Sequence, residues 1–140
     1  MVAENANGGI NAQEAADGTV VAVPLAGTNA VAGDVVTVTV GGVATPYTLT
    51  AADIAAGTAN VALPASALAT QGSQPLTATI TDKAGNVSAP ATTTITVDTQ
   101  VPGAASIQGL TDDIAPGVGA ISNGGITNDK SPTVRISRSE

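Results

Sequence analysis

The sequence predicts an all-β fold, an antiparallel β-sandwich, and three observations support this prediction. Apolar and polar residues alternate along most of the chain, turn-forming residues separate the alternating runs, and the stretches compatible with helices are short. A period of two in β-branched residues is typical of strands that bury one face. Thr on the other face favours extended backbone and stays in contact with water.

The alternating runs, taken in chain order, define the expected strands of the first hundred residues. They lie at residues 21–25, 36–40, 47–49, 61–63, 76–81 and 93–98. Turn signals such as Asp-Gly and Gly-Gly separate them, at residues 17–18, 32–34, 41–42, 56–57, 71–73 and 84–86. About seven short strands in a hundred residues predict an immunoglobulin-like (Ig-like) sandwich. Only residues 51–56 and 65–69, both Ala-rich, could form helices, of one or two turns each.

The composition predicts a packed core and excludes several kinds of partner. Hydrophobic residues make up 43% of the chain and charged residues 11%, the opposite of a disordered tail. The chain has no Cys and one aromatic residue, Tyr47, so Val, Ile, Leu and Ala must fill the core without disulfides. A net charge of -7, with no cluster of basic residues, argues against nucleic acid and against a basic membrane-binding face. No apolar run reaches the roughly 20 residues that span a bilayer, so no membrane insertion is expected.

A change of composition around residues 97–103 predicts two parts. We expect one Ig-like repeat in residues 1–98, a linker at 99–103, and in 104–140 the truncated start of a second Ig-like repeat. The tail offers strand candidates only at 105–110, 120–121 and 132–137, and three strands rarely form a stable domain. The tail strands could instead be added to the first sandwich, or to an open sheet edge of a neighbouring chain. We expect the tail to be less stably packed than the first part.

Three stretches resemble the bacterial Ig-like (BIg) tandem repeats of Bap-type giant surface adhesins, which type I systems secrete. They are Thr-Asp-Lys-Ala-Gly-Asn at 81–86, Val-Asp-Thr-Gln-Val-Pro at 97–102, and the run from Leu110 to Thr133. Residues 9–15 resemble the first strand of such a repeat, whereas residues 138–140 depart from the usual continuation. The resemblance implies an extracellular stalk of sandwiches on the bacterial cell surface, in cell adhesion and biofilm formation. It also implies calcium at repeat junctions, with neighbouring repeats and a host or bacterial cell surface as partners.

Acidic and amide side chains lie where such calcium sites are expected. Ca²⁺ takes six to eight oxygen ligands from carboxylates, amides and backbone carbonyls. The candidate ligands are Asp98, Asp112, Asp113, Asn128 and Asp129 near the junction, with Asn123 close by, and Glu14 and Asp82 at the far end of the first sandwich. The alternative is that these residues only form turns, since no D-x-D-x-D-G loop is present.

The sequence offers little chemistry for catalysis. No His or Cys is available as a base or thiol nucleophile. A glycosidase built on paired carboxylates would need aromatic platforms for sugars, and Tyr47 is expected to be a core or edge residue instead. We therefore predict no enzyme but a structural spacer. The alternative is a ligand-binding Ig-like module for a host glycan or protein, which would expose aromatic or Arg side chains.

Overall fold

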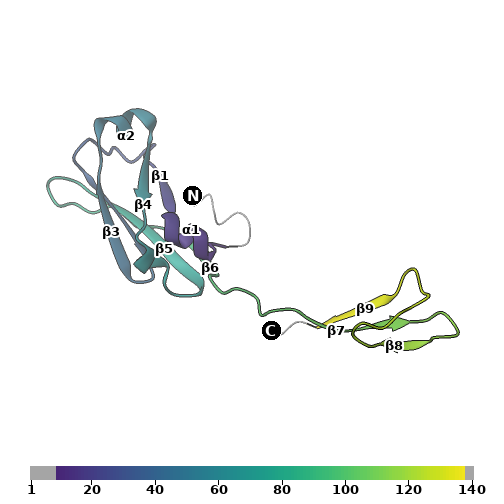
Figure 1. The fold of residues 1–140 in the computed structure, drawn as a ribbon. Helices are drawn as coiled ribbons and strands as arrows, with labels where there is room; N and C mark the ends of the chain where they lie inside the picture. Colours follow the sequence, from purple (N-terminus) through teal and green to yellow (C-terminus); the bar gives the residue numbers. More distant parts are fainter. Residues whose placement is uncertain (1–8, 138–140) are drawn as a thin grey trace. The chain divides into compact units, whose positions relative to one another are not determined.

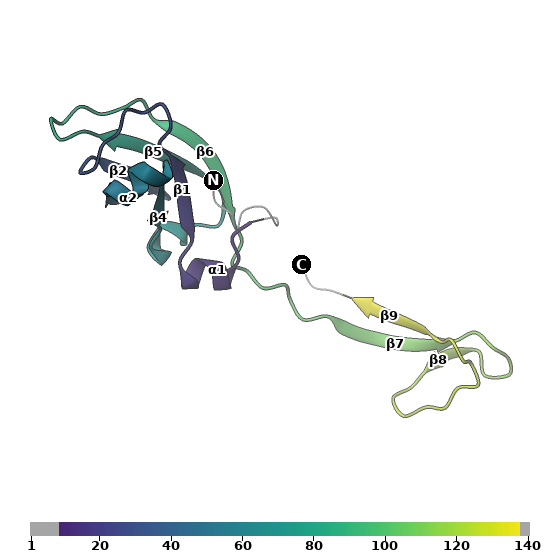
Figure 2. The same ribbon diagram turned by 90° about the horizontal axis from the view of Figure 1, so that it is seen from above.

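The computed structural model describes residues 9–137 of the chain. They divide into two compact units, with the boundary between Gln100 and Val101. The described part of the first unit, shown in Figures 1 and 2, contains six strands: β1 (Val20–Pro24), β2 (Val35–Val40), β3 (Val43–Thr48), β4 (Thr58–Ala62), β5 (Gly72–Thr81) and β6 (Ala91–Val97). Whether the second unit is the start of another repeat stays a prediction.

The strands of the first unit form two antiparallel sheets. One has the order β3-β2-β5-β6, and the other pairs β1 with β4. Buried side chains from both sheets form one hydrophobic cluster, so the two sheets pack face to face. The predicted antiparallel Ig-like sandwich is confirmed.

The central strand β2 shows how the sequence pattern builds this core. Val36, Val38 and Val40 are completely buried, and the Thr residues between them point to the other face. Burying a Val side chain stabilises the fold by roughly 1.5–3 kcal/mol. Gly41 and Gly42 join β2 to β3 with φ values of 56° and 79°. Those angles fit the two-residue hairpin turn whose twist matches the flanking strands.

The prediction of a first strand in residues 9–15 is wrong. Only Ile10 takes part in a sheet, through an isolated parallel bridge to Val97, and the chain then forms helix α1 (Ala12–Asp17). The Asn11 side chain accepts hydrogen bonds from the backbone amides of Gln13 and Glu14, and the Glu14 carboxylate accepts one from the Asn11 amide. This reciprocal cap starts the helix, and three Ala residues among its six favour continuing it.

The two predicted short helices are confirmed. Helix α2 (Ala51–Ala56) begins at Thr50, which forms a reciprocal cap with Asp53. The Tyr47 hydroxyl also donates to the Asp53 carboxylate, at 3.1 Å, so Tyr47 joins the end of β3 to this helix. The 3₁₀ helix η2 (Ala65–Leu68) buries Ala67 and Leu68 in the core. Among the described residues no helix combines the length and apolarity needed to cross a bilayer.

Thr45 on β3 is a weak point of the core. Its hydroxyl oxygen is buried and has no hydrogen-bond partner, and its strand neighbours on the same face, Val43 and Tyr47, pack against the core. A buried polar group without a partner destabilises a fold by roughly 1–3 kcal/mol. Thr45→Val should therefore raise the free energy of unfolding by about 1 kcal/mol, measured by urea denaturation. Thr48→Val, at an exposed position of the same strand, is the control. An equal gain in both variants would contradict this account.

The second unit is a single antiparallel sheet with the order β8-β7-β9. Its strands are β7 (Ser106–Asp112), β8 (Gly119–Ile121) and β9 (Thr133–Ser137), which confirms all three strand candidates of the tail. Within residues 9–137, the sixteen buried hydrophobic residues all belong to the first unit. In the described part of the second unit only Asp112 is buried. The described residues of this unit thus form no hydrophobic core of their own.

Candidate functional site

The loops of the second unit bring Asp112 and Asp129 together through Thr127. Asp112 ends β7, is 2% exposed, and accepts a hydrogen bond from the Thr127 hydroxyl at 2.6 Å. The oxygen of that hydroxyl accepts a hydrogen bond from the Asp129 backbone amide at 2.9 Å. The other Asp112 oxygen accepts from the Ile114 amide at 2.9 Å. Two acids that are 17 positions apart therefore share one hydroxyl group as a common neighbour.

The hydrogen bonds at Asp112 keep this carboxyl group ionised. The Thr127 hydroxyl, followed by the Ile114 amide, holds the pKa of Asp112 below its usual value because both donate to the charged form. Burial acts in the opposite direction but is the weaker influence. A negative charge is thus fixed in a place that water barely reaches.

Asp129 holds an oxygen atom whose hydrogen-bonding capacity is unused. Its Oδ1 accepts from the Ser131 amide at 2.7 Å, whereas its Oδ2 is buried and has no hydrogen-bond partner. A buried carboxylate oxygen without a donor is costly unless a cation or water binds it. This oxygen fits a calcium ligand, since Ca²⁺ prefers carboxylate oxygens. In the described residues, however, no three His, Cys, Asp or Glu side chains gather as a ready-made metal site.

The other two candidates of the second unit lie beside these acids in sequence. Asn128 donates from its side-chain amide to the Ala115 carbonyl at 3.2 Å, so it ties the two loops together. Asp113 is exposed, unlike the adjacent Asp112. Asp113 follows the last residue of β7 and lies in the loop that leads to β8.

In the first unit, the expected pairing of Glu14 with Asp82 is wrong. The bridge from Ile10 to Val97 places α1, and with it Glu14, at the end of the sandwich where β6 finishes. Asp82 follows β5 at the opposite end, because β5 and β6 run antiparallel with Gly72 opposite Val97. The Glu14 carboxylate also caps its own helix.

Asp82 and Asp98 both serve local turns. Asp82 accepts hydrogen bonds from the backbone amides of Ala84 and Asn86 and from the Asn86 side chain. Those donors, the Asn86 side chain first, hold the pKa of Asp82 below its usual value. The exposed Asp98 accepts from the Gln100 amide at 3.2 Å, while its own amide donates to the Ile10 carbonyl. Nothing in the structure tests whether any candidate ligand binds calcium, so these assignments stay predictions.

The part that Thr127 plays was missed by sequence reasoning. Thr127 precedes Asp129 by two positions, a spacing at which a hydroxyl group often accepts a hydrogen bond from the backbone and closes a turn. That pattern could have singled out Thr127, but not its long-range donation to Asp112. The buried Asp34, which is 4% exposed and accepts from the Val31 amide at 2.9 Å, was not singled out either.

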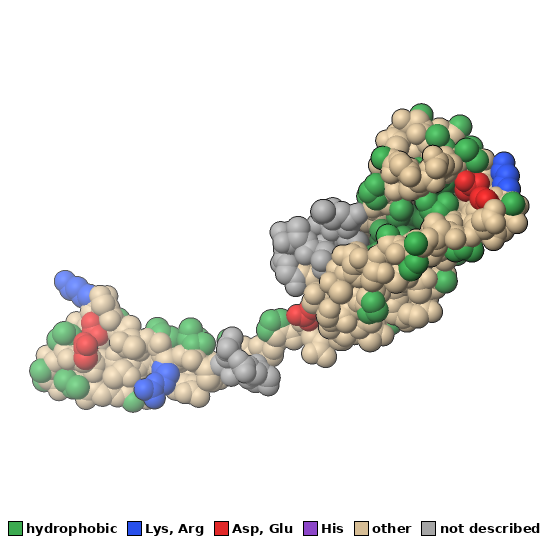
Figure 3. All heavy atoms as spheres, turned by 180° about the vertical axis from the view of Figure 1, so that it is seen from behind, with side chains coloured by type: hydrophobic (Ala, Val, Ile, Leu, Met, Phe, Trp, Pro, Cys, Tyr) green, Lys and Arg blue, Asp and Glu red, His purple; other side chains and the backbone are tan. Residues whose placement is uncertain are grey.

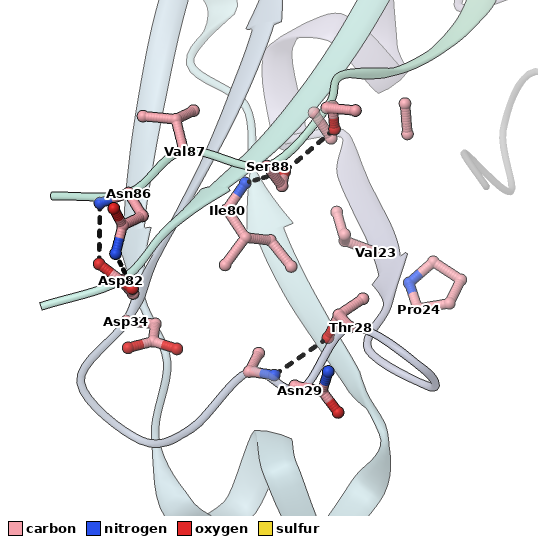
Figure 4. A pocket seen from close by; sticks show the side chains of 14 residues that line it. Val23, Pro24, Thr28, Asn29, Asp34, Ile80, Asp82, Asn86, Val87 and Ser88 are labelled. Carbon is pink, nitrogen blue, oxygen red and sulfur yellow. Dashed lines mark hydrogen bonds between the residues drawn. The ribbon is translucent and has the colours of Figure 1, made fainter. Parts of the chain in front are cut away.

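A hollow of about 550 Å³ opens on the first unit, between β1, β5 and the segment that follows β5. Figure 4 shows Asp34, Asp82 and Asn86 on one side of it, with Val23 and Ile80 among its apolar lining. In Figure 3, hydrophobic side chains gather in a hollow on one face of this unit. The lining consists of aliphatic and small polar residues and includes neither an aromatic nor an Arg side chain. It lacks the kind of side chains that usually dominate protein or glycan recognition.

A family model described as a bacterial Ig-like domain matches residues 2–99. Two solved structures are similar at 28% identity. One is of a Ca²⁺-stabilised adhesin that helps an Antarctic bacterium reach out and bind ice, with a TM-score of 0.49 over 80% of this chain. The chain spans only 26% of that protein's length. The other is a bacterial immunoglobulin-like domain from the M. primoryensis ice-binding adhesin, with a TM-score of 0.45, covering 68% of this chain and 88% of that domain. The search of the curated proteins gives no match.

Proposed function

The chain belongs to the family of bacterial Ig-like domains, and we infer from this membership that it is a spacer repeat in the stalk of a bacterial surface adhesin. The match over residues 2–99 carries this inference, because it includes every strand of the first sandwich. The adhesin-like stretches at 81–86, 97–102 and 110–133 support the same function. The role is mechanical: tandem sandwiches hold an adhesive part away from the cell surface, in adhesion and biofilm formation. Its partners are neighbouring repeats and, through the whole adhesin, a cell surface.

Calcium binding is the second part of this proposal. Asp112 and Asp129 would hold the ion in the second unit: Asp112 supplies an ionised buried carboxylate bonded to the Thr127 hydroxyl, and Asp129, whose backbone amide donates to that hydroxyl, supplies a buried carboxylate oxygen without a hydrogen-bond partner. Backbone carbonyls and water would complete the six to eight oxygen ligands that Ca²⁺ takes. The bound ion would supply positive charge for the two acids and restrain the loops on either side of β8. Asp113 and Asn128 remain candidates for further ligands.

Calcium titration of the isotope-labelled chain tests this site. Amide NMR signals of residues 112–131 should shift as Ca²⁺ is added, with a dissociation constant of about 10⁻⁴ to 10⁻³ M, as in extracellular modules. At a few millimolar Ca²⁺ the second unit should gain about 1 kcal/mol in stability, measured by amide hydrogen exchange of β7 and β9. Asp129→Asn should abolish both effects, because an amide is a much weaker calcium ligand.

Asp17→Asn is the matched control for this titration. It removes the same charge from an exposed position in α1, far along the chain from Asp112 and Asp129. Its titration should match that of the original chain. If the Asp129→Asn and Asp17→Asn variants bind calcium equally well, the site is not at Asp129.

The ligand-binding alternative rests on the hollow beside β1. Its volume would suit a small ligand, and Asp34, Asp82 and Asn86 could supply hydrogen bonds. A labelled sample of the chain, incubated with host cells and with an array of immobilised glycans, separates the two functions. A spacer should be washed off both surfaces. Saturable retention, lost when Ala78 in the lining of the hollow is replaced by Trp, would favour the ligand-binding module.

A further inference from the structure

The chain enters and leaves the described first unit through two segments that lie side by side. Ile10 forms a parallel bridge to Val97, the last residue of β6, so α1 lies beside the point where the chain leaves β6 (Figure 2). The Ile10 amide donates to the Thr96 carbonyl at 2.8 Å, and the Ile10 carbonyl accepts from the Asp98 amide at 2.9 Å. The segment before α1 is therefore bonded directly to the strand that leads to the linker.

Close packing adds to these two hydrogen bonds. The Ile10 side chain is completely buried and belongs to the core cluster. Gly9 lies so close to β6 that a β-carbon there would come within 3.1 Å of the Thr96 carbonyl oxygen, which is the acceptor of the Ile10 amide. The φ of Gly9 is 139°, a value that glycine adopts far more readily than other residues. Glycine at this position thus allows the entering chain to approach β6.

On the exit side, Gln71 fixes the backbone just after β6. The side-chain oxygen of Gln71 accepts from the Thr99 amide at 2.9 Å, and the side-chain nitrogen donates to the Thr99 hydroxyl. Gln71 comes directly before β5, the strand that pairs with β6 along its length. The exit point is therefore held at Thr99, two positions beyond the end of β6.

The direction of the two segments decides how tension acts on them. Because the segments are parallel, pulling from Gly9 and Thr99 draws them in opposite directions along their own axes. Gly9 lies level with Thr96, so the two points are about 10 Å apart along the strand and about 5 Å apart across it. Tension thus acts mainly along the strands. It loads both hydrogen bonds of Ile10 at once instead of one after the other.

We propose that the pairing of residues 9–11 with β6 is a load-bearing clamp, which keeps tension away from the rest of the sandwich. Tension that enters at Gly9 crosses to β6 through the bridge at Ile10 and leaves through Thr99. Helix α1 and strands β1 to β5 lie between Ile10 and β6 in the sequence. They are therefore loaded only after the bridge opens.

The use of such a clamp rests on the proposed function, because a stalk repeat stands between a cell and the surface to which it adheres. A repeat that lengthened under small tension would slacken this attachment. The resistance itself is a property of the first unit and requires neither calcium nor a partner. A failed pulling experiment would therefore refute the clamp and leave the spacer function standing, whereas a protein that is no adhesin could still contain the clamp.

Single-molecule pulling with optical tweezers tests the clamp. The chain has no Cys, so Gly8→Cys and Gln100→Cys provide two unique attachment points, one on each side of the clamp. At constant force, Gly9→Ala should raise the unfolding rate about tenfold, because the new methyl group pushes the Thr96 carbonyl away from the Ile10 amide. A tenfold change corresponds to the loss of one hydrogen bond of about 1.4 kcal/mol.

Gly18→Ala is the matched control for Gly9→Ala. Gly18 has a positive φ of 103°, but a β-carbon there would meet no atom within 4 Å, and the residue lies between α1 and β1, off the path of tension. Both variants should lose stability in urea, because Ala is strained at positive φ. Under load, however, Gly18→Ala should unfold at the original rate within about a factor of two. If the two variants unfold equally fast under load, the clamp is refuted.

A second variant and a second pulling geometry make the test independent of one substitution. Gln71→Ala removes both bonds to Thr99 from an exposed position and should raise the unfolding rate about threefold in the same geometry. When the chain is pulled through Asp17→Cys and Ala84→Cys instead, the bridge is off the path of tension. Neither Gly9→Ala nor Gln71→Ala should then change the rate by more than about a factor of two. Effects of equal size in both geometries would show that the variants weaken the whole fold, and would overturn the proposal.

Discussion

Ile10→Ala should lower the free energy of unfolding of the first unit by about 3 kcal/mol, the usual cost of truncating a fully buried large aliphatic residue. Ile10 is 0% exposed and belongs to the core cluster, although it lies outside the named strands. Its backbone donates to the Thr96 carbonyl at 2.8 Å and accepts from the Asp98 amide at 2.9 Å. These two hydrogen bonds hold the backbone at Ile10 in place. We therefore expect the truncated side chain to leave a cavity, because the segment cannot move inward to fill the space.

Urea denaturation followed by tyrosine fluorescence measures this loss. Tyr47 is the only aromatic residue of the chain and lies on β3, so its signal reports the first unit alone. Ile54→Ala on α2 is the matched control, because Ile54 is 36% exposed and should lose about 1 kcal/mol or less. Similar losses in the two variants would mean that Ile10 does not help to fill the core.

The strands could be predicted wherever one face is buried and the other carries Thr. On β2, β5 and β6 the alternation of Val, Leu or Ile with Thr gave both the strand and its buried face. The segment around Ile10 was predicted to be a strand because residues 9–15 resemble the first strand of a repeat. The reciprocal cap between Asn11 and Glu14 starts a helix there instead. The spacing Asn11-x-x-Glu14, followed by Ala, is itself a helix-start signal, so this error could have been avoided.

The candidate site could be predicted only in part. The neighbourhood of Asp112 and Asp129 follows from their positions on either side of the short strand β8. The contact through Thr127 depends on how two irregular loops fold over each other, and no periodic pattern encodes that. The pairing of Glu14 with Asp82 failed for a topological reason: a parallel bridge at Ile10 brings α1 to the end of the sandwich opposite Asp82.

Gly41→Ala should also cause a large loss of stability, about 3 kcal/mol. Gly41 has a φ of 56°, and a β-carbon there would lie 2.8 Å from the Ala67 carbonyl oxygen. That oxygen belongs to the backbone of η2, whose Ala67 and Leu68 are buried. The new methyl group can be accommodated only if η2 shifts outward and loosens these core contacts. Urea denaturation monitored by Tyr47 fluorescence again provides the measurement.

Gly42→Ala separates this steric clash from the cost of backbone strain. Gly42 occupies the same turn with a φ of 79°, but a β-carbon there would meet no atom within 4 Å. Both variants place Ala at positive φ, which costs roughly 1–2 kcal/mol. The excess loss in Gly41→Ala therefore measures how firmly η2 is held against the turn, and the Ala67 and Leu68 NMR signals should shift in that variant alone. Equal losses in the two variants, with unshifted signals, would mean that η2 yields freely, so that the close contact at Gly41 contributes nothing to the stability of the sandwich.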